Sequence, residues 1–186
     1  MPKEMETIYL GSGCFWCAEA VFRIIRGVET VTPGYSGGNV SFPSYGAVCT
    51  GNTGHVEVVK LSYDTSIIGT DEILDVFFAI HDPTSWDRQG ADEGSQYRSV
   101  IFHTSQNQAE IARSKIAELE SSCAYSFPIV TQVRPFEVFY PAEHYHNNYY
   151  GRNRDAAYCR YVIDPKIEKI NRDFRAMVLP GSEEDA

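Results

Sequence analysis

The chain has 186 residues, of which 43% are hydrophobic and 22% are charged, as in an ordinary globular protein. This length predicts one catalytic domain over residues 1–180, followed by a flexible acidic tail at 181–186. The net charge of −9 argues against nucleic acid and anionic membranes as partners. No stretch is long and apolar enough to cross a bilayer, and the first residues lack the apolar core of a signal peptide, so we expect a cytoplasmic protein.

Strands and helices are expected to mix along the chain without strict alternation. The expected strands cover residues 6–10, 55–63, 99–103, 129–133 and 137–140. The expected helices cover residues 14–27, 70–80, 105–121 and 164–178, with Thr70 as a cap and Ser105 with Gln108 as a capping box. Segments rich in Gly, Pro, Ser and Asn predict long loops at 34–53 and 82–96. This order predicts an α+β fold, a two-layer sandwich of a mixed sheet and packed helices with a ferredoxin-like core.

The stretch from Gly13 to Cys17 is the most informative part of the sequence. Cys14 follows an expected strand and a glycine turn, at the start of an expected helix. Free N–H groups and the partial positive charge of a helix N-terminus stabilise a thiolate, which predicts a lowered pKa and a reactive Cys14. Phe15 and Trp16 beside it could form an apolar cup for a small group such as a methyl. The alternative is a buried cysteine packed on a helix.

Five cysteines, at irregular spacing, do not suggest a disulfide framework; they are Cys14, Cys17, Cys49, Cys123 and Cys159. Cys14 and Cys17 form a Cys-x-x-Cys pair, which is typical either of a thioredoxin-like redox pair or of half a zinc site. There is no second such pair, and His144-x-His146, the nearest candidate, is more typical of two solvated histidines. We therefore expect no metal.

Glu57 is a candidate general acid. On a strand over 55–63 it shares a face with Val59, Leu61 and Tyr63. If that face is the core side, burial raises the pKa of the carboxyl group and keeps it protonated near neutral pH. The alternative is a glutamate on an edge strand that faces water.

Several segments of the chain resemble the peptide-methionine (S)-S-oxide reductase family. They run in family order from residue 8 to about 165 and are specific when taken together; they cover residues 13–16, 34–38, 45–57, 81–84, 87–92, 96–99, 142–146 and 158–160. The resemblance implies that Cys14 is the nucleophile and that Phe15 and Trp16 hold the methyl group of the sulfoxide. It further implies that Asp92 orders the site and that Tyr158 lines the pocket, although on their own these residues suggest a turn former and surface packing.

The same resemblance implies a thiol mechanism without a bound cofactor. Glu57, Tyr45 and Tyr97 match the groups that bind and protonate the sulfoxide oxygen. Attack by Cys14 on the S epimer of methionine sulfoxide, free or in proteins, would leave methionine and a cysteine sulfenic acid. A second cysteine would then form an intramolecular disulfide, which thioredoxin would reduce.

The sequence departs from many family members at the cysteines that complete the cycle. Many members have glycine at the position of Cys17, and many carry a further cysteine in a C-terminal tail, whereas this chain has none after Cys159. Cys17 and Cys159 are both candidate resolving cysteines, and a relay that uses both is a third possibility. Two other functions stay open: a thioredoxin-like thiol-disulfide oxidoreductase that uses Cys14 and Cys17, and a non-catalytic module that binds oxidised peptides.

Overall fold

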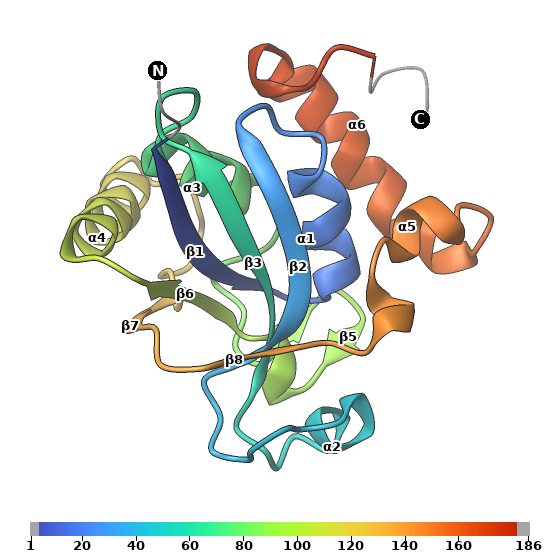
Figure 1. Cartoon of the computed structure of the whole chain (residues 1–186). Helices are drawn as coiled ribbons and strands as arrows, with labels where there is room; N and C mark the ends of the chain where they lie inside the picture. The colour runs from blue at the N-terminus through green and yellow to red at the C-terminus, as the bar shows by residue number, and fades with distance from the viewer. Residues whose placement is uncertain (1–3, 182–186) are drawn as a thin grey trace.

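The computed structural model describes residues 4–181 and contains, within them, a six-stranded mixed sheet with packed helices (Figure 1). The strands lie in the order β7-β6-β1-β3-β2-β8. Their bounds are Met5–Ser12 for β1, Val28–Ser36 for β2, Val56–Asp64 for β3, Ser99–His103 for β6, Gln132–Pro135 for β7 and Phe139–Pro141 for β8. Neighbouring strands are antiparallel, except that β6 and β7 are parallel. The predicted α+β class is confirmed, whereas the finer assignment of a ferredoxin-like core stays a prediction.

The helices cover one face of the sheet and enclose the larger part of the core. Their bounds are Phe15–Phe22 for α1, Tyr45–Cys49 for α2, Thr70–Ala79 for α3, Gln106–Ser121 for α4, Tyr149–Arg152 for α5 and Asp164–Asp173 for α6. Along β3, Val59, Leu61 and Tyr63 belong to this large core, whereas Val56 and Val58 belong to a smaller cluster. This alternation is the period-two pattern of a strand that separates two faces.

Helix α1 begins directly after a glycine turn. Gly13 has a φ of 94° and Cys14 is the extended N-cap residue, so the helix starts at Phe15. It ends at Phe22, earlier than the predicted end at Gly27, because Ile25 already pairs with Val178 in an isolated antiparallel β-bridge. Nearly every residue of α1 is buried, which fixes the position of its first turn against the sheet.

The expected caps are partly correct. Ser105 accepts a hydrogen bond from the Gln108 amide, as predicted, but the Gln108 side chain accepts from the Thr104 amide instead of completing the box. At α3 the cap is Gly69, so the expectation for Thr70 is wrong. Thr70 is the first helical residue, and its hydroxyl lies 2.8 Å from the Tyr63 hydroxyl.

The two loops expected from Gly and Pro both contain regular structure. Strand β2 extends into the first, because the carbonyl of Pro33 accepts from the Ala142 amide and Gly34 lets β8 approach closely. Helix α2 also lies within that loop. The second loop contains the short ribbon of β4 (Arg88–Gln89) and β5 (Asp92–Glu93) and a 3₁₀ turn at Ser95–Tyr97.

Near the C-terminus the boundaries shift more than the order of elements. Strands β7 and β8 begin a few residues later than predicted. A π-helical turn at Cys159–Ile163 precedes α6, which ends at Asp173 instead of 178. Apart from Gly181, the expected acidic tail lies outside the described residues. Over residues 4–181, no helix is long and apolar enough to cross a membrane.

The turn before α1 generates a stability prediction. A Cβ atom on Gly13 would lie 2.6 Å from Cγ of Gln89, and its φ of 94° disfavours any L side chain. Gly13→Ala should therefore lower the free energy of unfolding by about 1–3 kcal/mol, measured by urea denaturation. Gly46→Ala is the control, because an added Cβ on this helical glycine meets nothing within 4 Å. Equal stability of the two variants would contradict this account.

Candidate active site

Cys14 and Glu57 meet at the N-terminus of α1. The Phe15 amide, the first of the helix, donates a 3.0 Å hydrogen bond to Oε2 of Glu57. Cys14 is the half-buried N-cap residue. The partial positive charge of the helix end therefore acts first on the carboxyl group of β3 rather than on the thiol.

The surroundings of Cys14 raise its pKa. Burial is the main cause, and the hydrogen bond with Cys17 and the charges of Cys17 and Glu57 act in the same direction. The prediction of a lowered pKa at Cys14 is therefore wrong for the unliganded site. The helix start is present as expected, but its nearest amide is occupied by Glu57.

Glu57 has the properties expected of a general acid. Its side chain is only 1% exposed, on the helix-covered face of β3. Burial raises the pKa of its carboxyl group to about 8, against the opposing effect of the Phe15 amide. The predicted raised pKa is confirmed, and the group is mostly protonated at pH 7.

Tyr45 and Tyr97 lie close to Glu57, although they come from different segments. Tyr45 is the first residue of α2, and Tyr97 is the last residue of the 3₁₀ turn after β5. For both, burial raises the pKa of the phenol, and the charge of Glu57 is the next cause. Both phenols therefore remain hydrogen-bond donors at any physiological pH.

Asp92, Tyr158 and Cys17 form a chain of hydrogen bonds behind Cys14. The Tyr158 hydroxyl donates to Oδ2 of Asp92 at 2.8 Å and lies 3.7 Å from Sγ of Cys17. Since its single proton is directed at Asp92, the phenol oxygen accepts from the Cys17 thiol. The hydrogen bond with Cys14 is the main cause that lowers the pKa of Cys17 to about 7, and the charge of Lys166 contributes.

Trp16 is fixed by three neighbours. Its ring stacks on Tyr149 at 3.6 Å between centroids and meets the Tyr158 ring edge-on at 5.7 Å. Its indole N–H donates to Nδ1 of His146 at 3.0 Å. Phe15, packed between Tyr35 and His146, is fully buried. Trp16 remains half-buried, so it is the accessible wall of the cup.

Sequence reasoning gave no role to the residues that hold this arrangement together. Glu143 accepts hydrogen bonds from the Tyr35 hydroxyl at 3.0 Å and from the Tyr45 amide at 2.9 Å. Burial alone would raise the pKa of Glu143, but these hydrogen bonds outweigh it and leave the pKa below its ordinary value. Glu19, which is 1% exposed, accepts from the Asn148 amide and so ties α1 to the segment that carries His146. For Glu143 the signal available was its position within the family-like segment at 142–146, whereas Glu19 lies outside those segments.

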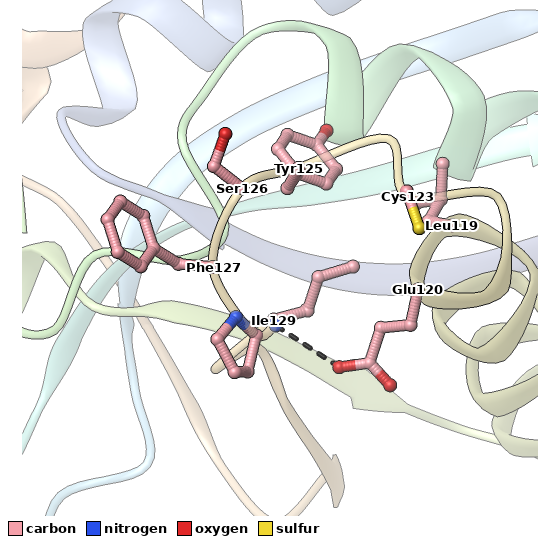
Figure 2. A pocket seen from close by; sticks show the side chains of 8 residues that line it. Leu119, Glu120, Cys123, Tyr125, Ser126, Phe127 and Ile129 are labelled. Carbon is pink, nitrogen blue, oxygen red and sulfur yellow. Dashed lines mark hydrogen bonds between the residues drawn. The ribbon is translucent and has the colours of Figure 1, made fainter.

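The cysteine pair borders a small cavity of about 140 Å³. Its other lining residues are Gln89, Gly90, Ala91, Asp92, Tyr158, Val162 and Lys166. A hollow of about 300 Å³ beside the end of α4 is lined by Cys123 and Phe127, but none of the predicted site residues lines it (Figure 2). Among the described residues, no three His, Cys, Asp or Glu side chains gather as a metal site.

Cys49 and Cys123 are exposed, whereas Cys17 and Cys159 are buried. Cys159 follows Tyr158, and burial raises the pKa of its thiol, with the charge of Cys17 among the smaller causes. Both candidate resolving cysteines thus lie close to the site, as expected from the position of Cys17 near Cys14 and of Cys159 after Tyr158 in the sequence.

Comparison with known proteins gives a consistent result. The family model described as peptide methionine sulfoxide reductase matches residues 6–177. A peptide methionine sulfoxide reductase MsrA of Thermus thermophilus is 48% identical over 180 residues, which is 97% of this chain and 100% of the relative.

Solved structures agree with this. Methionine sulfoxide reductase A of Corynebacterium diphtheriae has a TM-score of 0.77 at 36% identity, over 83% of this chain and 77% of its own. Reduced Mxr1 from Saccharomyces cerevisiae has a TM-score of 0.76 at 34% identity, over 84% of this chain and 90% of its own. Mxr1 in complex with Trx2 has a TM-score of 0.53 at 24% identity, over 80% and 89% of the two chains.

The raised pKa of Glu57 predicts a pH-dependent stability. Between the unfolded value near 4.5 and the folded value of about 8, the folded protein keeps a proton that the unfolded chain has lost. Rising pH therefore favours unfolding in this window, by about 1.4 kcal/mol per pH unit, and the effect levels off above the folded pKa. Glu57→Gln should lack this slope when urea unfolding is measured across the window. Parallel profiles for wild type and variant would contradict the buried-acid assignment.

Proposed function

The chain belongs to the peptide methionine sulfoxide reductase family, and on this premise we propose that it reduces the S epimer of methionine sulfoxide through Cys14. The observation that carries the proposal is the contact of a buried, protonated Glu57 with the helix turn that bears Cys14. An acid and a nucleophile must act together here, because sulfoxide oxygen leaves only when it is protonated. A non-catalytic binding module has no use for such an acid.

The substrate is held by groups of opposite character. The methyl group packs against Trp16, whose ring is fixed by Tyr149 and His146, with Phe15 as the buried floor. The sulfoxide oxygen takes the opposite position, beside Glu57 and the two phenols that interact with it. Since a pyramidal sulfur places methyl and oxygen in these two positions with one handedness, only one epimer directs its sulfur at Cys14.

The reductive step transfers two electrons from Cys14 to the sulfoxide sulfur. One proton leaves the Cys14–Cys17 pair, and the remaining proton moves to Cys17, which leaves the thiolate on Cys14. The thiolate attacks the sulfoxide sulfur while Glu57 protonates the oxygen; the oxygen then passes to the Cys14 sulfur, the bond between the two sulfurs breaks, and methionine departs as the thioether. Cys14 keeps the oxygen as a sulfenic acid. Tyr45 and Tyr97 donate hydrogen bonds to the oxygen during its transfer, and Asp92 holds Tyr158 against the pocket.

Regeneration requires a second thiol and an external reductant. The thiol of Cys17, hydrogen-bonded to Cys14, attacks the sulfenic acid, so that a disulfide forms and water leaves. Cys159 then exchanges with this disulfide, or replaces Cys17 as its first partner. Thioredoxin reduces the product by dithiol exchange, in keeping with the solved complex of the similar protein Mxr1 with Trx2. No bound cofactor is needed.

We further propose that residues 1–180 form a single catalytic domain and that the protein acts in the cytoplasm. The family model spans 6–177, so the match covers nearly all of the proposed domain. The large core cluster includes residues from β1 through α6 and the following Val178, which supports one folding unit.

Turnover of the two separated sulfoxide epimers with dithiothreitol tests the proposed function. Wild type should reduce only the S epimer, and Cys14→Ser should lose turnover altogether, because the remaining groups of the site include no equally placed thiol. Cys123→Ser is the control, since this exposed cysteine lines the hollow beside α4, where none of the proposed site residues lies. Comparable rates on both epimers, or substantial activity of Cys14→Ser, would contradict the proposed reduction of the S epimer through Cys14.

Peptide mapping after one equivalent of sulfoxide tests the order of disulfides. In wild type we expect a Cys14 disulfide with Cys17 or Cys159, and Cys17→Ser should accumulate either the Cys14–Cys159 bond or the sulfenic acid. The first methionine should still be released at close to the wild-type rate, because Cys14 carries that step. A Cys14 disulfide with Cys49 or Cys123 would show the regeneration scheme to be wrong.

A further inference from the structure

An apolar hollow lies next to Tyr45, beside the proposed site of the sulfoxide oxygen. Its volume is about 490 Å³, and its lining residues are Phe42, Pro43, Ser44, Phe139, Tyr140, Pro141 and Glu143. Exposed apolar side chains surround it, since Phe42 is 87% exposed and the neighbouring Val138 and Tyr145 are 36% and 56% exposed. Gathered apolar side chains at a protein surface are typical of a binding site.

The exposed ring of Phe42 is held in place by a fixed loop. Phe42 has a φ of 49°, which is unusual for a large residue, and its ring meets that of Tyr140 at 5.2 Å. The loop before it is fastened by His55, whose Nδ1 accepts from the Gly38 amide. Because this leaves the proton on Nε2, the ring donates to the Val40 carbonyl at 2.7 Å. A fixed ring loses little conformational freedom when it binds a partner.

The hollow is continuous with the proposed sulfoxide site. Ser44 lines the hollow, and the next residue is Tyr45, which is assigned to the sulfoxide oxygen. Glu143 lines it too, and the same carboxylate accepts from the Tyr45 amide. Because consecutive residues of a peptide lie about 3.8 Å apart, the neighbour of a bound methionine sulfoxide falls within reach of this hollow.

We propose that the hollow is a subsite for an apolar side chain that adjoins methionine sulfoxide in a protein substrate. The proposal rests on the proposed function and extends it from the sulfoxide group to its sequence context. Aromatic rings and prolines supply the contact area, while the ionised Glu143 and the net charge of −9 disfavour an acidic neighbour. The preferred protein substrates are thus oxidised segments that expose apolar sequence normally buried in a folded protein.

The test compares kcat/KM for free methionine sulfoxide and for short peptides with leucine or aspartate beside the sulfoxide, using dithiothreitol as reductant. Wild type should prefer the leucine peptides by about 10-fold, the discrimination that an open apolar pocket provides. Phe42→Ser should bring the ratio close to one and leave the free substrate unchanged. Phe42→Asn is a second variant, because asparagine tolerates the left-handed backbone of this position.

Phe127→Ser is the matched control. Phe127 is 72% exposed, but it lies in the loop between α4 and β7 and lines a different hollow (Figure 2). This variant should keep the wild-type preference, so that a general loss of surface hydrophobicity cannot mimic the effect. Loss of the preference in Phe127→Ser as well would overturn the assignment of the subsite to Phe42.

Three further results would overturn the subsite while leaving the proposed function intact. They are a wild-type ratio near one, an unchanged ratio in both Phe42 variants, and an equal loss on peptides and free substrate in both. Dimerisation that Phe42→Ser abolishes, with an unchanged ratio, would instead identify a second copy as the occupant. Absence of turnover on free sulfoxide by the folded wild type would overturn the proposed function, and the subsite with it.

Discussion

The hydrogen bond from the Phe15 amide to Glu57 is the interaction on which the site depends. It joins the first turn of α1 to the middle of the sheet, at a point where the carboxyl group is almost completely buried. A charged carboxylate would be costly there, and one backbone donor is too little to compensate for the lost hydration. The group therefore keeps its proton, and the same helix turn that binds it presents Cys14 beside it. The proposed acid and the proposed nucleophile are thus placed by one contact.

A second constraint is the segment from Glu143 to Asn148, which closes the site from the far end of the chain. Its residues hold Tyr45 through Glu143 and Trp16 through His146, across 98 and 130 residues of sequence. The buried Glu19 binds the Asn148 amide and so anchors the same segment to α1. The proposed cup and the proposed oxygen site are thus aligned by one short stretch of chain. Small shifts of this segment would disturb both at once.

The sequence predicted the local features of the site well and its long-range features poorly. The glycine turn, the helix start at Cys14 and the core face of Glu57 follow from short patterns, and all three are present. Strand β2 was missed because Pro33 and Gly34 are typical of loops, although here they accommodate the neighbouring β8. The lowered pKa expected at Cys14 is wrong mainly because burial raises the pKa of the thiol, and the helix amide does not offset this. No local pattern shows that Glu57, 42 residues away, takes the helix amide.

The electrostatics of the two thiols follow from the same burial. If Cys14 were a free thiolate at rest, it would lie unpaired beside Glu57 and destabilise any remaining charge on that carboxylate. Shared hydrogen bonding with Cys17 avoids this, because one proton stays between the sulfurs while the charge of Lys166 stabilises the thiolate on the Cys17 side. In the proposed mechanism, Cys14 then becomes a thiolate only when the remaining proton moves to Cys17. Such a resting state limits the oxidation of Cys14 by small oxidants, since these react with the thiolate rather than the thiol.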